Sequence, residues 1–139
     1  MPPTDAEAPP VDRPVLEYVR DTLRQTRQFE SARLVDDGNL ALRATLATTY
    51  YPAATTATLT VRWFTNDDFG VHYREERPDG DWECRWDRHP NTHNDRDHYH
   101  PPPDAATPGV DESRPTDYRD VVGLVLDRIE RRIESLWEG

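Results

Sequence analysis

The feature that most limits what this chain can fold into is an alternation of apolar and polar residues between positions 31 and 87. A period of two places every second side chain on the same face of a β-strand, so each alternating stretch predicts one strand. The stretches cover 31–36, 40–46, 59–64, 71–76 and 82–87, and turn sequences such as Asp37-Gly38-Asn39 and Pro78-Asp79-Gly80-Asp81 lie between them. Because tight turns join strands that run in opposite directions, the pattern predicts an antiparallel meander of about five strands.

A helix is predicted on each side of the meander. The first runs from Asp12 to about Phe29, because Asp12 is a good N-terminal cap and Pro14 fits the first helical turn. The second begins at Thr116 or Asp117 and carries the strongest helical pattern of the chain. The expected fold class is therefore α+β, an antiparallel sheet flanked by an N-terminal and a C-terminal helix. The apolar residues of the second helix are Val122, Val125, Leu126, Ile129, Ile133, Leu136 and Trp137.

The two faces of the predicted sheet differ in polarity. The apolar residues of the strands share one face, which we expect to pack against the helices, and Cys84 falls on that face. Cys84 is therefore predicted to be a small core residue and not a reactive thiol. The opposite face is expected to face water, and it carries Arg43, Arg62, Arg74 and Arg85 among acidic residues.

The chain is predicted to form one domain, residues 12–139, after a disordered tail, residues 1–11, that is rich in proline and acidic residues. Its single cysteine excludes an internal disulfide. The first residues show no apolar segment typical of a signal peptide, and the longest uncharged run, 44–61, contains seven Thr and one Pro. We therefore expect a cytoplasmic protein that does not bind a membrane.

The charge balance is strongly acidic. The net charge is −10, from 27 acidic and 17 basic residues, and all of the basic residues are arginine. Salt screens the repulsion between like charges, and an acidic surface without lysine is typical of proteins adapted to high salt. We interpret the acidity as a halophilic adaptation, so it does not exclude RNA as a partner.

Stability is expected to rise steeply with salt concentration, because screening relieves the repulsion that a net charge of −10 causes. Thermal unfolding between low and molar salt measures this, and the midpoint should climb over the whole range. A midpoint that stays constant would remove the halophilic interpretation and would turn the charge into a functional feature.

The most unusual chemistry lies in one segment. Four of the five histidines, His89, His93, His98 and His100, occur within twelve residues, at the start of a stretch, 89–116, without periodicity. Residues before proline favour extended backbone, which applies to His89 and His100. An extended backbone places the imidazoles of His98 and His100 on one side of the chain, with Cα atoms about 6.5 Å apart. Two such imidazoles can share a phosphate or a metal ion.

Three interpretations of this loop are open. In the first, the histidines cleave RNA by general acid–base chemistry, and Arg85, Arg88 or Arg96 holds the phosphate. In the second, two or three histidines bind a metal ion together with Asp95 or Asp97. The spacing matches no standard zinc signature, so we expect no tightly bound metal. In the third, the loop is structural or binds a protein partner.

Four motifs give the chain a resemblance to a known family. They are Val71-His72-Tyr73-Arg74-Glu75, Asp79-Gly80, Cys84-Arg85-Trp86-Asp87-Arg88-His89-Pro90 and Asp97-His98-Tyr99-His100. In this order, and followed by an amphipathic helix, they resemble the TumE-type toxin family of toxin–antitoxin systems, and the composition is similar to that of a haloarchaeal-type member. The resemblance covers residues 29–137, with Arg88 where the family has Asn and Asp97 where it has Pro.

The resemblance implies a two-gene module, in which a DNA-binding antitoxin encoded by the neighbouring gene is the protein partner. Ribonuclease-like activity through loop 89–100, without a cofactor, is the expectation by analogy. The alternatives are a non-enzymatic protein-interaction module and a metal-binding accessory domain. Arg88 and Arg96 are expected to bind the substrate. The residues that carry over as catalytic candidates are Arg85, Asp87, His89, His98 and His100.

Overall fold

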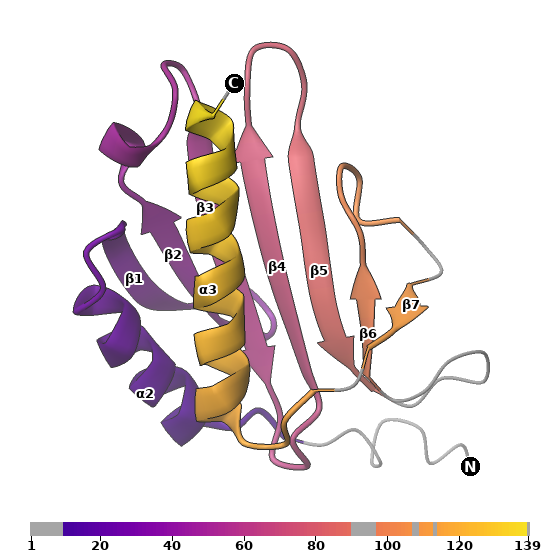
Figure 1. Ribbon diagram of the computed structural model, residues 1–139. Coiled ribbons are helices and arrows are strands. Elements are labelled where there is room, and N and C mark those ends of the chain that lie inside the picture. Colours follow the sequence, from indigo (N-terminus) through magenta and orange to yellow (C-terminus); the bar gives the residue numbers. More distant parts are fainter. Residues whose placement is uncertain (1–9, 90–96, 107–108, 113, 139) are drawn as a thin grey trace.

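The computed structural model of the chain describes residues 10–89, 97–106, 109–112 and 114–138. The described strands form one antiparallel sheet in the order β1 to β7. The helices α2 and α3 lie on the same face of this sheet (Figure 1). The elements are α2 (Arg13–Arg24), β1 (Phe29–Asp36), β2 (Leu40–Leu46), the 3-10 helix η1 (Thr48–Tyr50), β3 (Thr56–Trp63), β4 (Phe69–Glu76), β5 (Trp82–Arg88), β6 (Asp97–His100), β7 (Val110–Asp111) and α3 (Tyr118–Trp137).

The predicted fold class is confirmed, since a helix at each end flanks an antiparallel meander. The sheet has seven described strands instead of about five, because β6 and β7 form in the segment that shows no alternation. The first helix ends at Arg24, and Phe29 is instead the buried first residue of β1. Val11, predicted to belong to the tail, already forms a β-bridge with Phe64, whereas residues 1–9 lie outside the described residues.

Both long helices begin at the residues that the sequence indicates. The Asp12 side chain accepts a hydrogen bond from the backbone N–H of Val15 at 3.2 Å. The Asp117 side chain accepts one from the backbone N–H of Arg119 at 2.8 Å. These bonds satisfy backbone donors that have no partner within the first turn of a helix, and they fix where each helix starts.

The main core lies between the two helices and the apolar face of the sheet. Trp63 stacks on Phe69 with ring centroids 4.6 Å apart, and Leu16 and Leu23 of α2 are fully buried. Cys84 is also buried, and burial raises the pKa of its thiol to about 11. The thiol therefore stays protonated and unreactive near neutral pH, which confirms its predicted place in the core.

The helices cover only part of the sheet. In Figure 1, α2 and α3 lie over β1–β4, and β5, β6 and β7 extend beyond α3. The segment after β6 adds further contacts at this edge, since the backbone N–H of Glu83 donates to the carbonyl of Pro103 at 2.8 Å. The candidate site lies in this part of the fold, on the face of the sheet opposite the helices.

Candidate functional site

The pairing of β5 with β6 brings together four of the predicted site residues. In this antiparallel register Asp87 lies opposite His98, and Arg85 lies opposite His100. Residues that face one another across antiparallel strands project to the same side of the sheet. Because Trp86, between Arg85 and Asp87, faces the helix side, these four side chains project to the other side.

Three imidazoles and one carboxylate converge there, and we call Asp87, His89, His98 and His100 the imidazole–carboxylate cluster. The Nε2 atoms of His89 and His98 are 3.2 Å apart. The Oδ2 atom of Asp87 lies 3.0 Å from His100 Nε2 and 3.7 Å from His89 Nε2. One ligand-type atom from each of Asp87, His98 and His100 lies within 4.8 Å of the other two. The cluster therefore concentrates four groups that exchange protons or bind cations.

The cluster is more deeply buried than the sequence suggests. Because His98 and His100 fall in a stretch without strand or helix periodicity, a place outside the core is the expectation for both, but they are only 1% and 4% exposed. That expectation was wrong because the segment 97–100 forms a strand against β5, and the residues after it fold back over His100. The His89 side chain, by contrast, is 47% exposed. His89 is therefore the most solvent-accessible member of the cluster.

A backbone carbonyl determines which ring nitrogen of His100 carries the proton. Its Nδ1 atom lies 2.9 Å from the carbonyl oxygen of Ala106, which can only accept a hydrogen bond. His100 Nδ1 must therefore carry a proton, and in the neutral ring Nε2 presents a lone pair. That lone pair is buried beside the Asp87 carboxylate. His100 Nε2 and Asp87 Oδ2 are close enough for an ion pair, but their geometry is not that of a hydrogen bond.

Arg85 adds a positive charge at the edge of the cluster. Its Nε atom donates to Asp87 Oδ2 at 2.9 Å, and its side chain is 38% exposed. This contact compensates part of the Asp87 charge. The predicted group of Arg85, Asp87, His89, His98 and His100 is thus one contiguous site in the structure, while the catalytic roles of these residues stay predictions.

A hollow of about 350 Å³ opens beside the cluster, at the end of the sheet where β3 and β5 finish and β4 starts. Its volume lies within the range of small-ligand pockets. An exposed guanidinium, from Arg62, and a half-buried aromatic ring, from Phe64, line it together with members of the cluster. Phe64 was not predicted as a site residue, and Arg62 was expected only to face water on the polar face of the sheet. The lining residues are Arg62, Phe64, Asp68, Phe69, Gly70, Asp87, Arg88 and His89.

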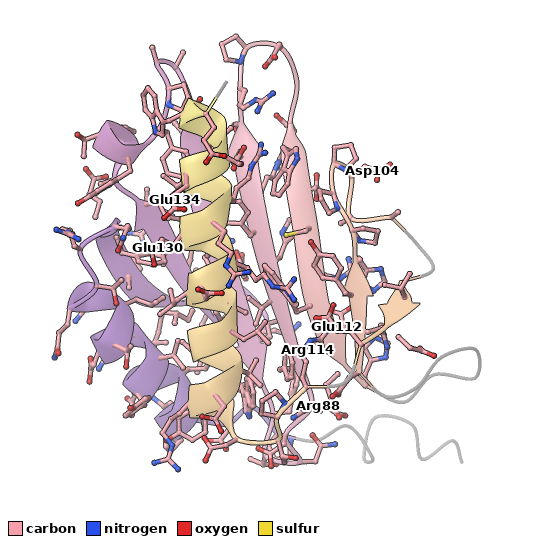
Figure 2. The ribbon with its side chains drawn as sticks, viewed as in Figure 1. Arg88, Asp104, Glu112, Arg114, Glu130 and Glu134 are labelled. Carbon is pink, nitrogen blue, oxygen red and sulfur yellow. The ribbon has the colours of Figure 1, made fainter. Side chains whose placement is uncertain are left out.

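Arg88, predicted to bind the substrate, is anchored inside the protein. Its guanidinium donates to both carboxylate oxygens of Asp97, at 2.6 and 3.2 Å, and to the carbonyls of Pro115 and Thr116. It also lies over the ring of Phe69, 5.0 Å from the centroid. Figure 2 shows Arg88 near the start of α3. The residue therefore ties the end of β5 to the segment before α3, and a contact with phosphate would require this network to open.

Arg114 reinforces the same anchor, although no sequence pattern indicates this role. Its guanidinium donates to the backbone carbonyls of Asp87 and His98, which belong to the two strands that carry the cluster. Burial lowers the pKa of Arg114, although the nearby Glu112 and Asp97 carboxylates favour its charge. Arg114 lies beside Arg88 in Figure 2. It therefore fixes the spacing of β5 and β6 underneath the cluster.

Gly109 is another residue that sequence reasoning missed. A Cβ atom at this position would lie 2.9 Å from the backbone oxygen of Tyr99 and 3.0 Å from Cε1 of His100. The backbone thus passes the His100 ring at a distance that only glycine permits. Arg96, the other predicted substrate-binding residue, and His93 lie outside the described residues.

Fold and site together define a small α+β protein whose polar site lies on the sheet face opposite its helices. The chain matches the family described as Toxin TumE over residues 15–133, a range that begins in α2, contains the whole sheet and ends in α3. The chain therefore belongs to the TumE toxin family, which confirms the resemblance of its motifs. No curated protein and no solved structure matches the chain.

Membership of this family gives the chain a toxin-like role, and a toxin of this kind has an antitoxin as its protein partner. None of the helices in the described parts of the chain is long and apolar enough to cross a membrane.

Proposed function

We propose that the chain is the toxin of a toxin–antitoxin module and that it inhibits growth by acting on RNA at the imidazole–carboxylate cluster. The observation that carries the proposal is a cluster of three imidazoles and a carboxylate, of which His89 and Asp87 line a hollow that also offers a guanidinium and an aromatic ring. Guanidinium groups hold phosphates, and aromatic rings stack on unpaired bases. The hollow therefore offers both kinds of contact that a single-stranded ribonucleotide needs.

Within this site His89 is the best placed group for proton transfer to a bound substrate. RNA cleavage requires a base that takes the proton of a 2′-hydroxyl, whose oxygen then attacks phosphorus, and an acid that returns a proton to the leaving 5′-oxygen. His89 borders the hollow and has His98 Nε2 at 3.2 Å, to which a proton can pass. Arg62 and Arg85 would hold the phosphate and stabilise its added charge.

The partner that we propose is a DNA-binding antitoxin encoded by the neighbouring gene, and the toxin would act in the cytoplasm, where its RNA substrate is. A partner that covers the hollow or the His89 side chain would block access to the cluster, since the other three members are buried.

Induced expression of the wild-type chain is expected to stop growth, and co-expression of the neighbouring gene should restore it. His89→Ala should reduce the inhibition on the order of 100-fold, because one acid–base group is lost. Since the His89 side chain is half exposed, the substitution should change the free energy of unfolding by no more than about 0.5 kcal/mol. Growth curves, RNA integrity in the induced cells and thermal unfolding measure the three effects.

His72→Ala is the matched control. His72 projects from β4 toward Glu83, 2.7 Å away, and lies outside the cluster. The His72→Ala variant should therefore be as toxic as the wild type. A His89→Ala variant that remains fully toxic, or a wild type that never inhibits growth, contradicts the proposal. In either case the non-enzymatic protein-interaction module becomes the better account.

A further inference from the structure

We propose that the imidazole–carboxylate cluster is a binding site for one divalent transition-metal ion of the zinc class. The ligands would be Asp87, His89, His98 and His100. The sequence argued against such a site, because its linear spacing matches no standard zinc signature. The ligand set is instead assembled across the β5–β6 pair, where Asp87 lies opposite His98.

The distances within the cluster fit a single small ion. Nitrogen and oxygen ligands bind zinc at about 2.0–2.1 Å, so two ligand atoms of a tetrahedral site lie about 3.3 Å apart. Three separations in the structure are 3.2 Å between the Nε2 atoms of His89 and His98, 3.0 Å between His100 Nε2 and Asp87 Oδ2, and 3.7 Å between His89 Nε2 and Asp87 Oδ2. They bracket the tetrahedral value. One ligand-type atom from each of Asp87, His98 and His100 also lies within 4.8 Å of the other two. These three side chains form the centre of the ligand set, and His89, whose Nε2 lies near His98 and Asp87, would complete it.

Two buried hydrogen-bond acceptors that face each other in the cluster also favour a bound cation. With Nδ1 of His100 donating to the Ala106 carbonyl, its Nε2 lone pair faces a carboxylate oxygen, which is another acceptor. His100 Nε2 is buried without a hydrogen-bond partner among the described residues. Two acceptors 3.0 Å apart repel each other unless a proton or a metal ion lies between them. A ring N–H donated to a backbone carbonyl is also the usual outer partner of a histidine that binds metal.

The donor set selects the class of ion. Imidazole nitrogens favour zinc, cobalt, nickel, copper and iron, whereas calcium and magnesium are bound mainly by oxygen atoms. A set of three imidazoles and one carboxylate therefore favours a transition-metal ion over calcium or magnesium. Arg85, which donates to Asp87 Oδ2 at 2.9 Å, would act from outside the ligand shell by orienting the carboxylate.

The ligands differ in how firmly they are held. Asp87, His98 and His100 are buried, and the carbonyls of Asp87 and His98 are fixed by the Arg114 guanidinium. His89 is half exposed and borders the hollow. Three buried ligands and one half-exposed ligand would hold an ion at the wall of the hollow, where a substrate could approach it. The site itself does not depend on the proposed action on RNA, and with an ion bound His89 Nε2 would be a ligand and no longer the group that takes a proton.

Metal binding can be measured on the full chain, purified without a histidine tag and stripped with a chelator. Isothermal titration calorimetry with zinc should give a binding stoichiometry of one ion per chain. Titration with cobalt should give the visible absorption of a tetrahedral site with nitrogen and oxygen ligands. His89→Ala should weaken zinc binding by at least about 10-fold and alter the cobalt spectrum, because one ligand is replaced by water or lost. Since His89 is half exposed, this variant keeps its fold.

Asp87→Asn is the second variant, and it keeps the size of the side chain while removing its charge. It should weaken zinc binding on the order of 100-fold or more, and thermal unfolding of the chelated protein reports whether its fold is intact. His72→Ala is the matched control, since His72 pairs with Glu83 and is not one of the four proposed ligands, and this variant should bind zinc as the wild type does.

The proposal is overturned if the wild-type chain binds no stoichiometric zinc or cobalt, or if His89→Ala and His72→Ala bind zinc equally well. The metal site and the proposed function can fail separately. A chain that binds no metal but loses toxicity on His89→Ala works through proton transfer alone. A chain that binds zinc through the cluster but never inhibits growth keeps the metal site and loses the proposed function.

Discussion

Replacing Arg132 with methionine is expected to lower the free energy of unfolding by about 3–5 kcal/mol, because it leaves the buried carboxylate of Glu75 without its main partner. Glu75 is fully buried, and the Arg132 guanidinium donates to its two oxygens at 2.9 and 2.8 Å. The remaining contacts are the Tyr73 hydroxyl at 2.7 Å and Arg77 at 3.8 Å. Burial raises the pKa of Tyr73 far above its ordinary value, so this hydroxyl stays a hydrogen-bond donor but supplies no positive charge.

Urea unfolding at constant salt measures the loss, and Arg131→Met is the matched control on the same helix. Arg131 is exposed and pairs with Asp127 at 3.2 Å, so its replacement should cost less than about 1 kcal/mol. Adding Glu75→Gln to Arg132→Met should recover part of the loss, because a neutral amide costs less to bury than an unpaired carboxylate. If Arg132→Met is as stable as Arg131→Met, the buried pair does not have the role that its geometry indicates.

Trp86→Ala is expected to cost about 3–5 kcal/mol and to abolish growth inhibition through loss of the fold. Trp86 is almost completely buried on the helix side of β5, and its ring lies 5.6 Å from that of Tyr99 on β6. Removing the indole would leave a cavity under the β5–β6 pair, which is the pair that assembles the imidazole–carboxylate cluster. Urea unfolding and growth curves are the two measurements.

Trp137→Ala is the control for size and residue type. Trp137 lies at the exposed end of α3, where its Nε1 atom donates to the carbonyl of Tyr50 at 2.9 Å. Its replacement should cost about 1 kcal/mol, the contribution of one ordinary hydrogen bond, and should leave growth inhibition intact. A Trp86→Ala variant that stays folded and toxic would show that the indole does not support the β5–β6 pair.

The two kinds of variant separate stability from function along one strand. Trp86 and Asp87 are neighbours in β5, but the first faces the helix-side core and the second faces the cluster. Loss of Trp86 should therefore remove toxicity together with the fold. Loss of His89 should remove toxicity while the fold remains.

The sequence by itself determined the fold class, the two helix starts and the side of β5 to which each residue projects. These features depend on local patterns: alternation within a strand, apolar residues three and four apart within a helix, and a capping aspartate such as Asp12. The same alternation placed Arg85 and Asp87 on one face and Cys84 on the other, as the structure has them.

Only the tertiary structure decided how the site is assembled. Segment 97–100 contains Tyr99 and three polar residues, so it shows no apolar alternation. In the folded chain this segment pairs with β5, and Ala106 contacts His100, so that both His98 and His100 become buried. Arg114 and Arg132 stabilise backbone carbonyls or a carboxylate that lie 16 to 57 positions away. Local patterns cannot reveal such partners, because the free energy of a buried charge depends on groups that are adjacent only after the chain has folded.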